Sequence, residues 1–252
     1  MSSLLTETRF VRQMAVPEFG EATQQALASA TIAGVGCGAL GGLQAELLAR
    51  MGVGELRIAD FDVVSLMNLH RQILYTEADV ASKKAKIEAA VAHLSLLNSA
   101  MNLVSLNEKV TAKNIDGYLS GATVVLDATD NIESRFLIND WCVAHQVPWI
   151  YTGVSGTAGL ILPIVPGGPC LRCLYPEPPA PEDIAHPNTG GVLSTTVAMA
   201  VSLQVTQLLR ILNKTVQPGE LIRFNVWNPT LRTIKVPQNP ACACCGKPHE
   251  TI

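Results

Sequence analysis

The sequence predicts an α/β fold, a doubly wound sheet that is mostly parallel and ends in antiparallel strands. Three observations predict it. Strand-like and helix-like segments alternate through the first half of the chain, as in parallel βαβ units. A glycine-rich turn joins the first predicted strand to the first long helix, which is typical of a Rossmann-like unit. The later strands follow one another closely, as antiparallel neighbours do.

Local patterns predict the elements in chain order. Short apolar, β-branched runs bounded by turn residues indicate strands, and apolar residues spaced by three or four indicate helices. Ile87, Ala90, Val91, Leu94 and Leu97 are an example of the helical pattern. Strands are predicted over 31–35, 56–59, 103–106, 123–126, 149–152, 159–165, 221–226 and 231–236. Helices are predicted over 22–29, 40–51, 83–97, 132–145 and 192–212, with loop or short helix before residue 83 and a short helix towards Tyr118.

The chain is expected to form one domain over residues 1–252, with no linker that divides it. Its parts are a helical arm (1–30), a nucleotide-binding core (31–165), a loop rich in proline and glycine (166–191) and a C-terminal part with a helix, a hairpin and a cysteine-rich tail (192–252). The late helix is apolar, but Ser, Thr, Gln and Arg interrupt it, which favours a buried or subunit-interface helix over a membrane span.

Composition excludes several classes of protein. Hydrophobic residues make up 48% of the chain and charged residues 15%, which fits a buried parallel sheet covered by helices. The net charge of −3, with no long basic run, argues against nucleic-acid or membrane binding. The N-terminus lacks the pattern of a signal peptide. Seven cysteines without an export signal favour metal binding or thiol chemistry over disulfides. We therefore expect a cytoplasmic protein.

The turn after the first strand has the order G-x-G-x-x-G, with Gly36, Gly38 and Gly41. The first glycine allows the tight turn, the second lets backbone amides approach a phosphate, and the third lets the helix pack close to the sheet. Asp60, at the end of the second strand, is placed to accept hydrogen bonds from ribose hydroxyls. Taken alone, this motif favours an NAD or FAD oxidoreductase, or a glycine turn without a ligand.

Two acids follow the central strand. Asp127 and Asp130 lie where open α/β sheets bind their ligands, and a carboxylate there can hold Mg²⁺ against phosphates. The equal alternative is a helix cap made by Asp130 or Asn131. Cations and amides elsewhere could provide what a triphosphate needs and a dehydrogenase does not. These residues are Asn68, Arg71 and Lys84.

Four cysteines form two C-x-x-C pairs in turns rich in glycine and proline. They are Cys170 with Cys173, and Cys242 with Cys245. Two such pairs predict a tetrahedral, structural Zn²⁺ site that pins the C-terminal tail to a distant loop. A redox dithiol is the alternative, but that motif should open a helix after a strand. Cys244 could compete with Cys245, although the spacing favours Cys245.

Six segments occur together and in order. They are GVGCGALGG, ADFDVVSLMNLHRQ, SKKAK, DATDN, GPCLRCLYPEPP and PACACCG. This combination resembles the ubiquitin-activating-enzyme-like adenylyltransferases of the MoeB/ThiF/HesA family, from about Arg9 to Gly246. The resemblance displaces the dinucleotide-enzyme interpretation.

The resemblance implies roles for matching positions. The three glycines and Asp60 match the family's ATP-binding turn and ribose-binding acid. Asp130 matches its magnesium-associated catalytic acid. Arg12 matches an arginine that reaches into the other subunit's active site in a homodimer, whereas spacing alone had favoured a solvated surface for it. Asn68, Arg71 and Lys84 match its phosphate-contacting residues, and Cys170, Cys173, Cys242 and Cys245 its zinc ligands.

The implied reaction joins the C-terminal carboxylate of a small ubiquitin-fold sulfur-carrier protein, usually ending in Gly-Gly, to the AMP of ATP, with release of pyrophosphate. Many relatives carry a loop cysteine at the position matched by Pro187, and no cysteine lies between Leu174 and Ala241 here. The protein should therefore form the adenylate and leave sulfur transfer to a partner. Two alternatives stay open: adenylation of a short peptide's C-terminus, and a non-catalytic nucleotide-binding subunit.

Overall fold

The structure, a computed structural model, describes residues 9–178 and 191–246 of the chain. Its centre is an eight-stranded sheet with the order β3-β2-β1-β4-β5-β6-β7-β8. The strands are β1 (Thr31–Val35), β2 (Glu55–Ala59), β3 (Asn102–Leu106), β4 (Val124–Asp127), β5 (Trp149–Ser155), β6 (Ala158–Ile164), β7 (Glu220–Asn225) and β8 (Thr230–Lys235). Every strand expected from the sequence is present, with ends that move by a few residues.

The sheet is doubly wound. Strands β3, β2, β1, β4 and β5 are parallel to one another. The strand order reverses at β1, which pairs with β2 on one side and with β4 on the other. Strands β6, β7 and β8 are antiparallel. The mostly parallel sheet with antiparallel C-terminal strands is therefore confirmed. The reversal at β1 and β4 creates the crevice in which such sheets bind ligands, at the carboxyl ends of the strands.

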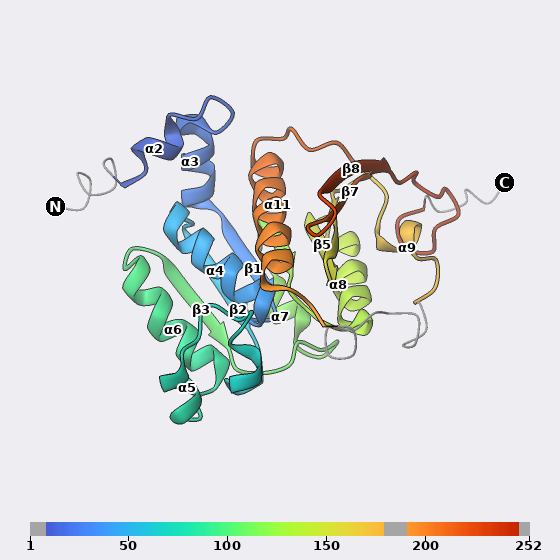
Figure 1. Ribbon diagram of the computed structural model, residues 1–252. Coiled ribbons are helices and arrows are strands. Elements are labelled where there is room, and N and C mark those ends of the chain that lie inside the picture. The colour runs from blue at the N-terminus through green and yellow to red at the C-terminus, as the bar shows by residue number, and fades with distance from the viewer. Residues whose placement is uncertain (1–8, 179–190, 247–252) are drawn as a thin grey trace.

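Helices cover both faces of the sheet (Figure 1). Helices α4 (Ala39–Met51), α6 (Lys86–Leu97) and α11 (Ser194–Leu212) pack on one face, in a core cluster that includes Leu48, Leu94 and Val201. Helices α7 (Ile115–Leu119) and α8 (Ile132–Ala144) cover the other face, in a second cluster. The shorter or peripheral helices are α2 (Val11–Met14), α3 (Gly20–Ser29), η1 (Leu66–Asn68), α5 (Glu77–Ala81) and α9 (Leu171–Leu174).

The chain between β2 and β3 differs from the sequence prediction. A loop or short helix was expected before about residue 83, and α5 fits it, but the long helix that was expected from about residue 83 begins only at Lys86. Thr76 and Asp79 form a reciprocal cap on α5, and Glu88 reaches back to the backbone N–H of Ala85 at the start of α6. Lys83 between them has a φ of 50°, which ends the first helix. This offset changes which lysine faces the carboxyl ends of the strands.

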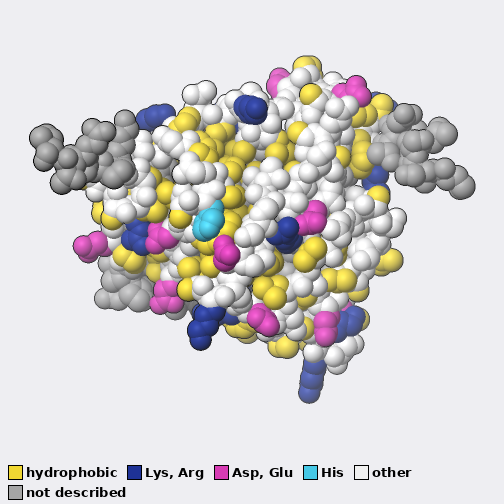
Figure 2. All heavy atoms as spheres, turned by 180° about the vertical axis from the view of Figure 1, so that it is seen from behind, with side chains coloured by type: hydrophobic (Ala, Val, Ile, Leu, Met, Phe, Trp, Pro, Cys, Tyr) yellow, Lys and Arg dark blue, Asp and Glu magenta, His cyan; other side chains and the backbone are white. Residues whose placement is uncertain are grey.

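Helix α11 is long and apolar enough to cross a membrane by length and composition alone. In the fold it is a core helix: it packs against α4, β5 and β6, and its Ala200, Val201 and Leu208 are fully buried. The interpretation as a buried helix is therefore supported. The opposite face of the molecule carries scattered charges of both signs with hydrophobic side chains between them (Figure 2).

Candidate nucleotide and metal sites

A cavity of about 330 Å³ lies at the carboxyl ends of β1, β2 and β4. Two glycines of the turn explain the shape of the backbone here. Gly36 has a φ of 97°, and a Cβ there would lie 2.6 Å from the Ala128 carbonyl oxygen. A Cβ on Gly41 would lie 2.0 Å from the Gly36 carbonyl oxygen, so α4 can approach the strand only without a side chain. Both distances agree with the roles that the sequence motif predicts.

Gly38 has a different environment. A Cβ at this position would meet only the Gln72 Nε2, at 3.5 Å, which is an ordinary contact. Gly38 lines the cavity and is the residue before the first turn of α4. The fold itself therefore tolerates a side chain there, and the space it would fill belongs to the cavity. The exposed N-terminal amides of α4 face an anion-binding position.

Asp60 anchors the glycine turn. Its carboxylate accepts hydrogen bonds from the backbone N–H of Cys37 at 2.8 Å and of Asp62 at 2.9 Å. The Lys86 amine lies 3.7 Å from the same carboxylate and 2.8 Å from that of Asp62. These bonds hold an acid at the end of β2, directly beside the turn, where the sequence placed a ribose-binding carboxylate.

Lys86 lines this cavity and Lys84 does not. The Lys86 side chain is 5% exposed and lines the cavity with Arg71. The Lys84 side chain is 39% exposed, and its amine pairs with Asp79 at 2.9 Å, away from the lining residues. The family resemblance had matched Lys84, and not Lys86, to a phosphate-contacting residue.

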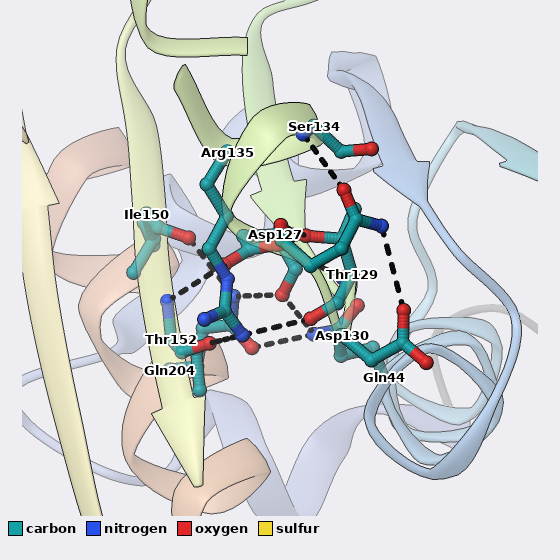
Figure 3. Close-up of polar contacts among 10 residues, drawn as sticks. Gln44, Asp127, Thr129, Asp130, Ser134, Arg135, Ile150, Thr152 and Gln204 are labelled. Carbon is teal, nitrogen blue, oxygen red and sulfur yellow. Dashed lines mark hydrogen bonds and ion pairs between the residues drawn. The ribbon is translucent and has the colours of Figure 1, made fainter. Parts of the chain in front are cut away.

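Asp127 and Asp130 separate into two roles (Figure 3). Asp127 is fully buried and accepts bonds from the Thr129 N–H and hydroxyl, the Thr152 N–H and the Arg135 guanidinium, the last at 3.1 Å. Arg135 also donates to the carbonyls of Thr129 and Thr152. This network fixes the loop after β4. Asp130 projects from that loop as an exposed carboxylate that lines the cavity.

The helix-cap alternative is resolved in favour of Asn131. Its side chain accepts a hydrogen bond from the Ser134 N–H at 2.9 Å and caps α8. Asp130 accepts only a long bond, 3.4 Å, from Asn131 among the hydrogen bonds of the described residues. Its carboxylate therefore keeps free lone pairs toward the cavity, and carboxylate oxygens are the ligands that Mg²⁺ prefers.

Two buried glutamines support the same loop from the other face of the sheet. Gln44 of α4 and Gln204 of α11 both donate to the Asp127 carbonyl oxygen, at 3.1 and 3.0 Å (Figure 3). The Gln204 amide also donates to the Ile150 carbonyl at 3.1 Å. The loop that carries Asp130 is therefore held by helices that begin at the glycine turn and after residue 193. These buried side-chain amides favour this one loop conformation, because a buried amide without a hydrogen-bond partner is energetically costly.

Gln72 provides an independent indication of a ligand. The residue is 5% exposed and lines the cavity, and its side-chain Oε1 is buried without a hydrogen-bond partner. A buried acceptor left unpaired costs about 1–3 kcal/mol. A bound donor such as a ribose hydroxyl or an amine would satisfy it. The residues around the cavity thus fit a nucleotide with a metal-bound phosphate chain: amides at the turn, cations that include Arg71 and Lys86, an open carboxylate and a buried acceptor without a partner.

Two predicted site residues lie outside this cavity. Asn68 is in η1, where its carbonyl accepts bonds from the N–H groups of Arg71 and Gln72. Its side chain does not line the cavity. Arg12 is exposed on α2, and its neighbour Gln13 donates to the carbonyl of Met51, the last residue of α4. Since α4 begins at the glycine turn, α2, which contains Arg12, lies at the other end of α4 from the cavity (Figure 1).

The four predicted zinc ligands do come together. The sulfur atoms of Cys170, Cys173, Cys242 and Cys245 all lie within 4.8 Å of one another. The Cys170–Cys242 pair is 3.6 Å apart and the Cys173–Cys245 pair 3.4 Å. Tetrahedral Zn²⁺ with Zn–S bonds of about 2.3 Å requires sulfurs roughly 3.8 Å apart, so the cluster fits this ion. Four thiolates would fill its coordination shell, which makes the site structural.

Neighbouring side chains orient the cysteine cluster. Buried Asn139 of α8 accepts a bond from the Leu171 N–H at 2.8 Å and donates to the Cys244 sulfur at 3.3 Å. Arg172 forms two hydrogen bonds to Asp140, at 2.9 and 2.6 Å. Cys244 therefore lies against α8 and outside the group of four, as the spacing predicted.

The remaining thiols are inert, and one predicted position lies beyond the described chain. Burial raises the pKa of the Cys37 thiol to about 12, and burial also raises the pKa of Cys142. Neither residue is available as a nucleophile. Pro187, which matches the loop cysteine of relatives, falls outside the described residues. Sequence reasoning missed Lys86, Gln72 and Arg135. Gln72 directly follows Arg71, at the end of the segment ADFDVVSLMNLHRQ that carries part of the family resemblance.

Fold and site together define a Rossmann-like α/β protein with a cavity at its glycine turn and a cluster of four cysteines that fits a metal ion. The family model described as ThiF family matches residues 10–244, and the chain belongs to this family.

Named relatives agree in chemistry but differ in length. The Bacillus subtilis sulfur carrier protein ThiS adenylyltransferase is 36% identical over 94% of this chain and 71% of its own. The SAMP-activating enzyme E1 of Haloferax volcanii is 33% identical over 95% of this chain and 88% of its own. The adenylyltransferase and sulfurtransferase MOCS3 of Anopheles gambiae is 36% identical over 95% of this chain, which spans only 55% of that relative.

A solved structure supports the fold. Escherichia coli MccB with MccA-N7isoASN superimposes with a TM-score of 0.82 at 22% identity, covering 96% of this chain and 75% of that one. At this identity the likeness concerns the architecture alone.

Proposed function

We propose that this protein is an adenylyltransferase that activates the C-terminal carboxylate of a small ubiquitin-fold sulfur-carrier protein with a Gly-Gly tail. The products are the acyl-adenylate and pyrophosphate. The observation that carries the proposal is the cavity that brings together the glycine turn, the anchored acid Asp60, the cations Arg71 and Lys86 and the open carboxylate of Asp130. The names of relatives that act on sulfur carriers support the choice of substrate.

The residues divide the work of binding ATP. Amides at Gly38 and the start of α4 hold phosphate oxygens, and Asp60 accepts from the ribose. Arg71 and Lys86 neutralise the phosphates, and Lys86 exchanges its carboxylate partners for them. Lys86 thus takes the role that the family resemblance had assigned to Lys84. Asp130 would hold Mg²⁺, which when bound supplies positive charge beside the phosphates.

Catalysis consists mainly of bringing two anions together in the right geometry. The attacking carboxylate and the α-phosphate repel each other, and the cations and turn amides of the cavity reduce this repulsion. The rigid support of the Asp130 loop by Asp127, Arg135, Gln44 and Gln204 keeps the geometry fixed. Each cation is expected to contribute about 2–4 kcal/mol to the transition state, by comparison with single oxyanion donors.

A homodimer would complete the site. The segment between β2 and α5 exposes Phe61, Val63, Leu66, Met67 and Ile73, each more than half exposed, beside the cavity. An apolar strip of this kind is typical of a protein interface. A second copy covering it could bring its Arg12 to the cavity that Arg12 does not reach in its own subunit. Asn68, next to this strip, would then also lie at the interface.

The proposed reaction ends at the adenylate. No cysteine occurs between Leu174 and Ala241, and the two remaining non-ligand thiols before that range, Cys37 and Cys142, are buried. A partner would supply the thiol or sulfide that consumes the adenylate.

ATP–pyrophosphate exchange tests the proposal. Exchange is expected with a purified Gly-Gly-tailed carrier and is expected to vanish when the tail is removed. Asp130→Ala should abolish exchange without lowering the melting temperature, because the side chain is exposed and makes only one long bond. Unchanged exchange in that variant would contradict the assignment. Nucleotide binding without exchange for any carrier would instead favour a non-catalytic subunit.

A further inference from the structure

We propose that Tyr151 and Tyr175 are positioning residues for the magnesium-binding acid: their packed rings hold Arg135, and through it the loop that carries Asp130, against the segment that the cysteine cluster anchors. This inference rests on the proposed function, because it takes Asp130 as the residue that holds Mg²⁺. It adds a physical connection between that acid and the predicted zinc site.

Arg135 is the polar link to the Asp130 loop. Its Nη2 donates to the carbonyl oxygens of Thr129 at 2.8 Å and Thr152 at 3.2 Å, so one guanidinium joins the loop to β5 (Figure 3). Its Nε donates to the Asp127 carboxylate at 3.1 Å. Thr129 immediately precedes Asp130, so a shift of the guanidinium reaches Asp130 through a single peptide unit.

The hydrogen bonds of Arg135 act in the plane of its guanidinium, and the Tyr151 ring covers the face of that plane. The Arg135 Cζ lies 5.3 Å from the centroid of the Tyr151 ring, within the range of a cation–π contact. Both residues are buried, with exposed fractions of 8% and 4%. Such a contact is stronger without water than at a surface. The ring therefore fixes the tilt of the guanidinium, which its in-plane bonds restrain less.

Two neighbours hold the Tyr151 ring in place. The Tyr175 ring meets it edge to face, with centroids 6.4 Å apart and an angle of 76° between the planes. Gly153 lies two residues further along β5, on the same face of the sheet. A Cβ there would lie only 2.8 Å from the Tyr151 hydroxyl oxygen. The ring therefore occupies the space that Gly153 leaves free and extends toward the carboxyl end of β5.

Tyr175 belongs to the segment that the cysteine cluster holds. It follows Cys173 by two residues, and its backbone N–H donates to the Leu171 carbonyl oxygen at 2.8 Å, which closes the turn of α9. Cys170 and Cys173 are two of the four predicted zinc ligands. The covalent chain and the packed rings thus form one continuous path from the cluster to Asp130. A metal that fixes α9 would also fix the Tyr175 ring.

Loss of this support should affect metal binding more than folding. The loop keeps its hydrogen bonds to Gln44 and Gln204 on the other face of the sheet when a ring is removed. The fold is therefore expected to persist, with Asp130 placed less precisely. Mg²⁺ requires nearly ideal octahedral geometry, so its binding is the property most sensitive to such a change.

Truncation of the outer ring tests the inference. Tyr175→Ala should weaken the binding of Mg²⁺·ATP about fivefold and should leave the affinity for ATP without Mg²⁺ within about twofold. Tyr175→Phe keeps the edge-to-face contact and should bind Mg²⁺·ATP as the wild type does. Isothermal titration calorimetry measures both affinities. His145→Ala is the matched control: it removes one ring of another stacked pair, with Trp141 at the C-terminal end of α8, and should change neither affinity.

A glycine substitution provides an independent variant with a predicted rescue. Gly153→Ala places a methyl group 2.8 Å from the Tyr151 hydroxyl oxygen and 3.4 Å from its Cζ, and should weaken Mg²⁺·ATP binding as Tyr175→Ala does. Adding Tyr151→Phe removes the hydroxyl and leaves only the ordinary contact, so the double variant should recover the wild-type affinity. A merely structural role would lower the melting temperature without this loss specific to Mg²⁺ and without the rescue.

A double-mutant cycle tests the connection to the cysteine cluster. Cys170→Ser, which is expected to lose Zn²⁺, should weaken Mg²⁺·ATP binding as much as Tyr175→Ala, and the two changes together should cause no further loss, because both break one path. Additive losses would overturn the connection. Equal Mg²⁺·ATP affinity in wild type and Tyr175→Ala overturns the positioning role and leaves the proposed function standing. Absence of exchange with every carrier, in a wild type that binds Mg²⁺·ATP, overturns the proposed function instead.

Discussion

Lys84 and Lys86 are two residues apart, yet they perform different physical tasks. Lys84 balances the buried Asp79 at the junction of α5 and α6, whereas Lys86 brings a nearly buried amine to the glycine turn. The sequence offers three lysines in four positions, and only the start of the helix decides which one points inward.

Substituting the two lysines separately should distinguish them. Lys86→Met is expected to lower kcat/KM for pyrophosphate exchange by about 10²–10³-fold, because a cation is lost beside the phosphates. Lys84→Met, an equal change in charge and size, should stay within about threefold, since its partly exposed ion pair is distant from the cavity. Steady-state kinetics of both variants decide the matter, and equal losses would return Lys84 to the site.

Single residues also mark what sequence reasoning could and could not find. Gly36, Gly38, Gly41 and Asp60 were predictable because motif spacing fixes local geometry over one turn. Asp127 and Asp130 were both candidates, since burial alone separates them and a sequence does not report burial. Arg135 was missed because its partner is a buried carboxylate eight residues earlier, a pairing that depends on how α8 packs.

At the scale of elements, the junction of α5 and α6 is held by one carboxylate. Burial acts to raise the pKa of Asp79, but hydrogen bonds from His93, Lys84 and Thr76 outweigh it, and the pKa lies below its usual range. A lowered pKa in the folded state stabilises the protein at every pH above the unfolded value, about 3.9. That stability is lost as the pH falls from there through the lower folded value.

Asp79→Asn should therefore be less stable at neutral pH, by about 1–3 kcal/mol in the free energy of unfolding. The difference between wild type and variant should shrink as the pH falls below about 4, because there the Asp79 carboxylate becomes protonated in the unfolded chain while it stays ionised in the folded protein. Urea unfolding at a series of pH values measures it. A difference that is constant down to the lowest pH would show that the charge of Asp79 contributes nothing.

The cysteine cluster joins two elements that are far apart in sequence, α9 and the segment after β8. Cys170→Ser is expected to lose Zn²⁺ and lower the melting temperature by about 10 °C, corresponding to roughly 3 kcal/mol. Cys244→Ser is the control: it should keep one Zn²⁺ per chain, because Cys244 lies outside the group of four. Metal analysis and thermal unfolding provide the readouts, and a stable, metal-free Cys170→Ser protein would refute the structural role.

Elements were predicted well where their pattern is local. Strand and helix positions followed from apolar periodicity, and both cysteine pairs followed from turn composition. The start of α6 at Lys86 was not predicted, because it depends on the positive φ of Lys83 and on a cap made by Thr76 and Asp79. Neither feature can be recognised from the sequence alone, because the apolar spacing there also fits a helix that starts earlier.

At the scale of the whole molecule, the position of Arg12 matters most. Arg12 and the cavity of the same chain lie at opposite ends of α4, so in the proposed homodimer a second subunit would bring them together. No sequence pattern within one chain could indicate this, and the family resemblance supplied the expectation.

Mixing two inactive variants tests the shared site. Arg12→Ala and Asp130→Ala should each abolish exchange alone. In a twofold-symmetric dimer, a one-to-one mixture after subunit exchange should recover about a quarter of wild-type activity, because half the dimers contain one intact site. Variants kept apart are the control. No recovery in a mixture that forms mixed dimers would place Arg12 outside the partner's cavity.

The tetracysteine cluster also constrains the order of synthesis. Cys170 precedes Cys242 by 72 residues, and α11 and the β7–β8 hairpin are made between them. The ribosome must therefore release the whole antiparallel half of the sheet before the second pair of thiolates can meet the first. If the cluster binds Zn²⁺ as predicted, metal capture would come last during biogenesis, and zinc starvation would leave newly made chains whose tail is not attached to the rest of the fold.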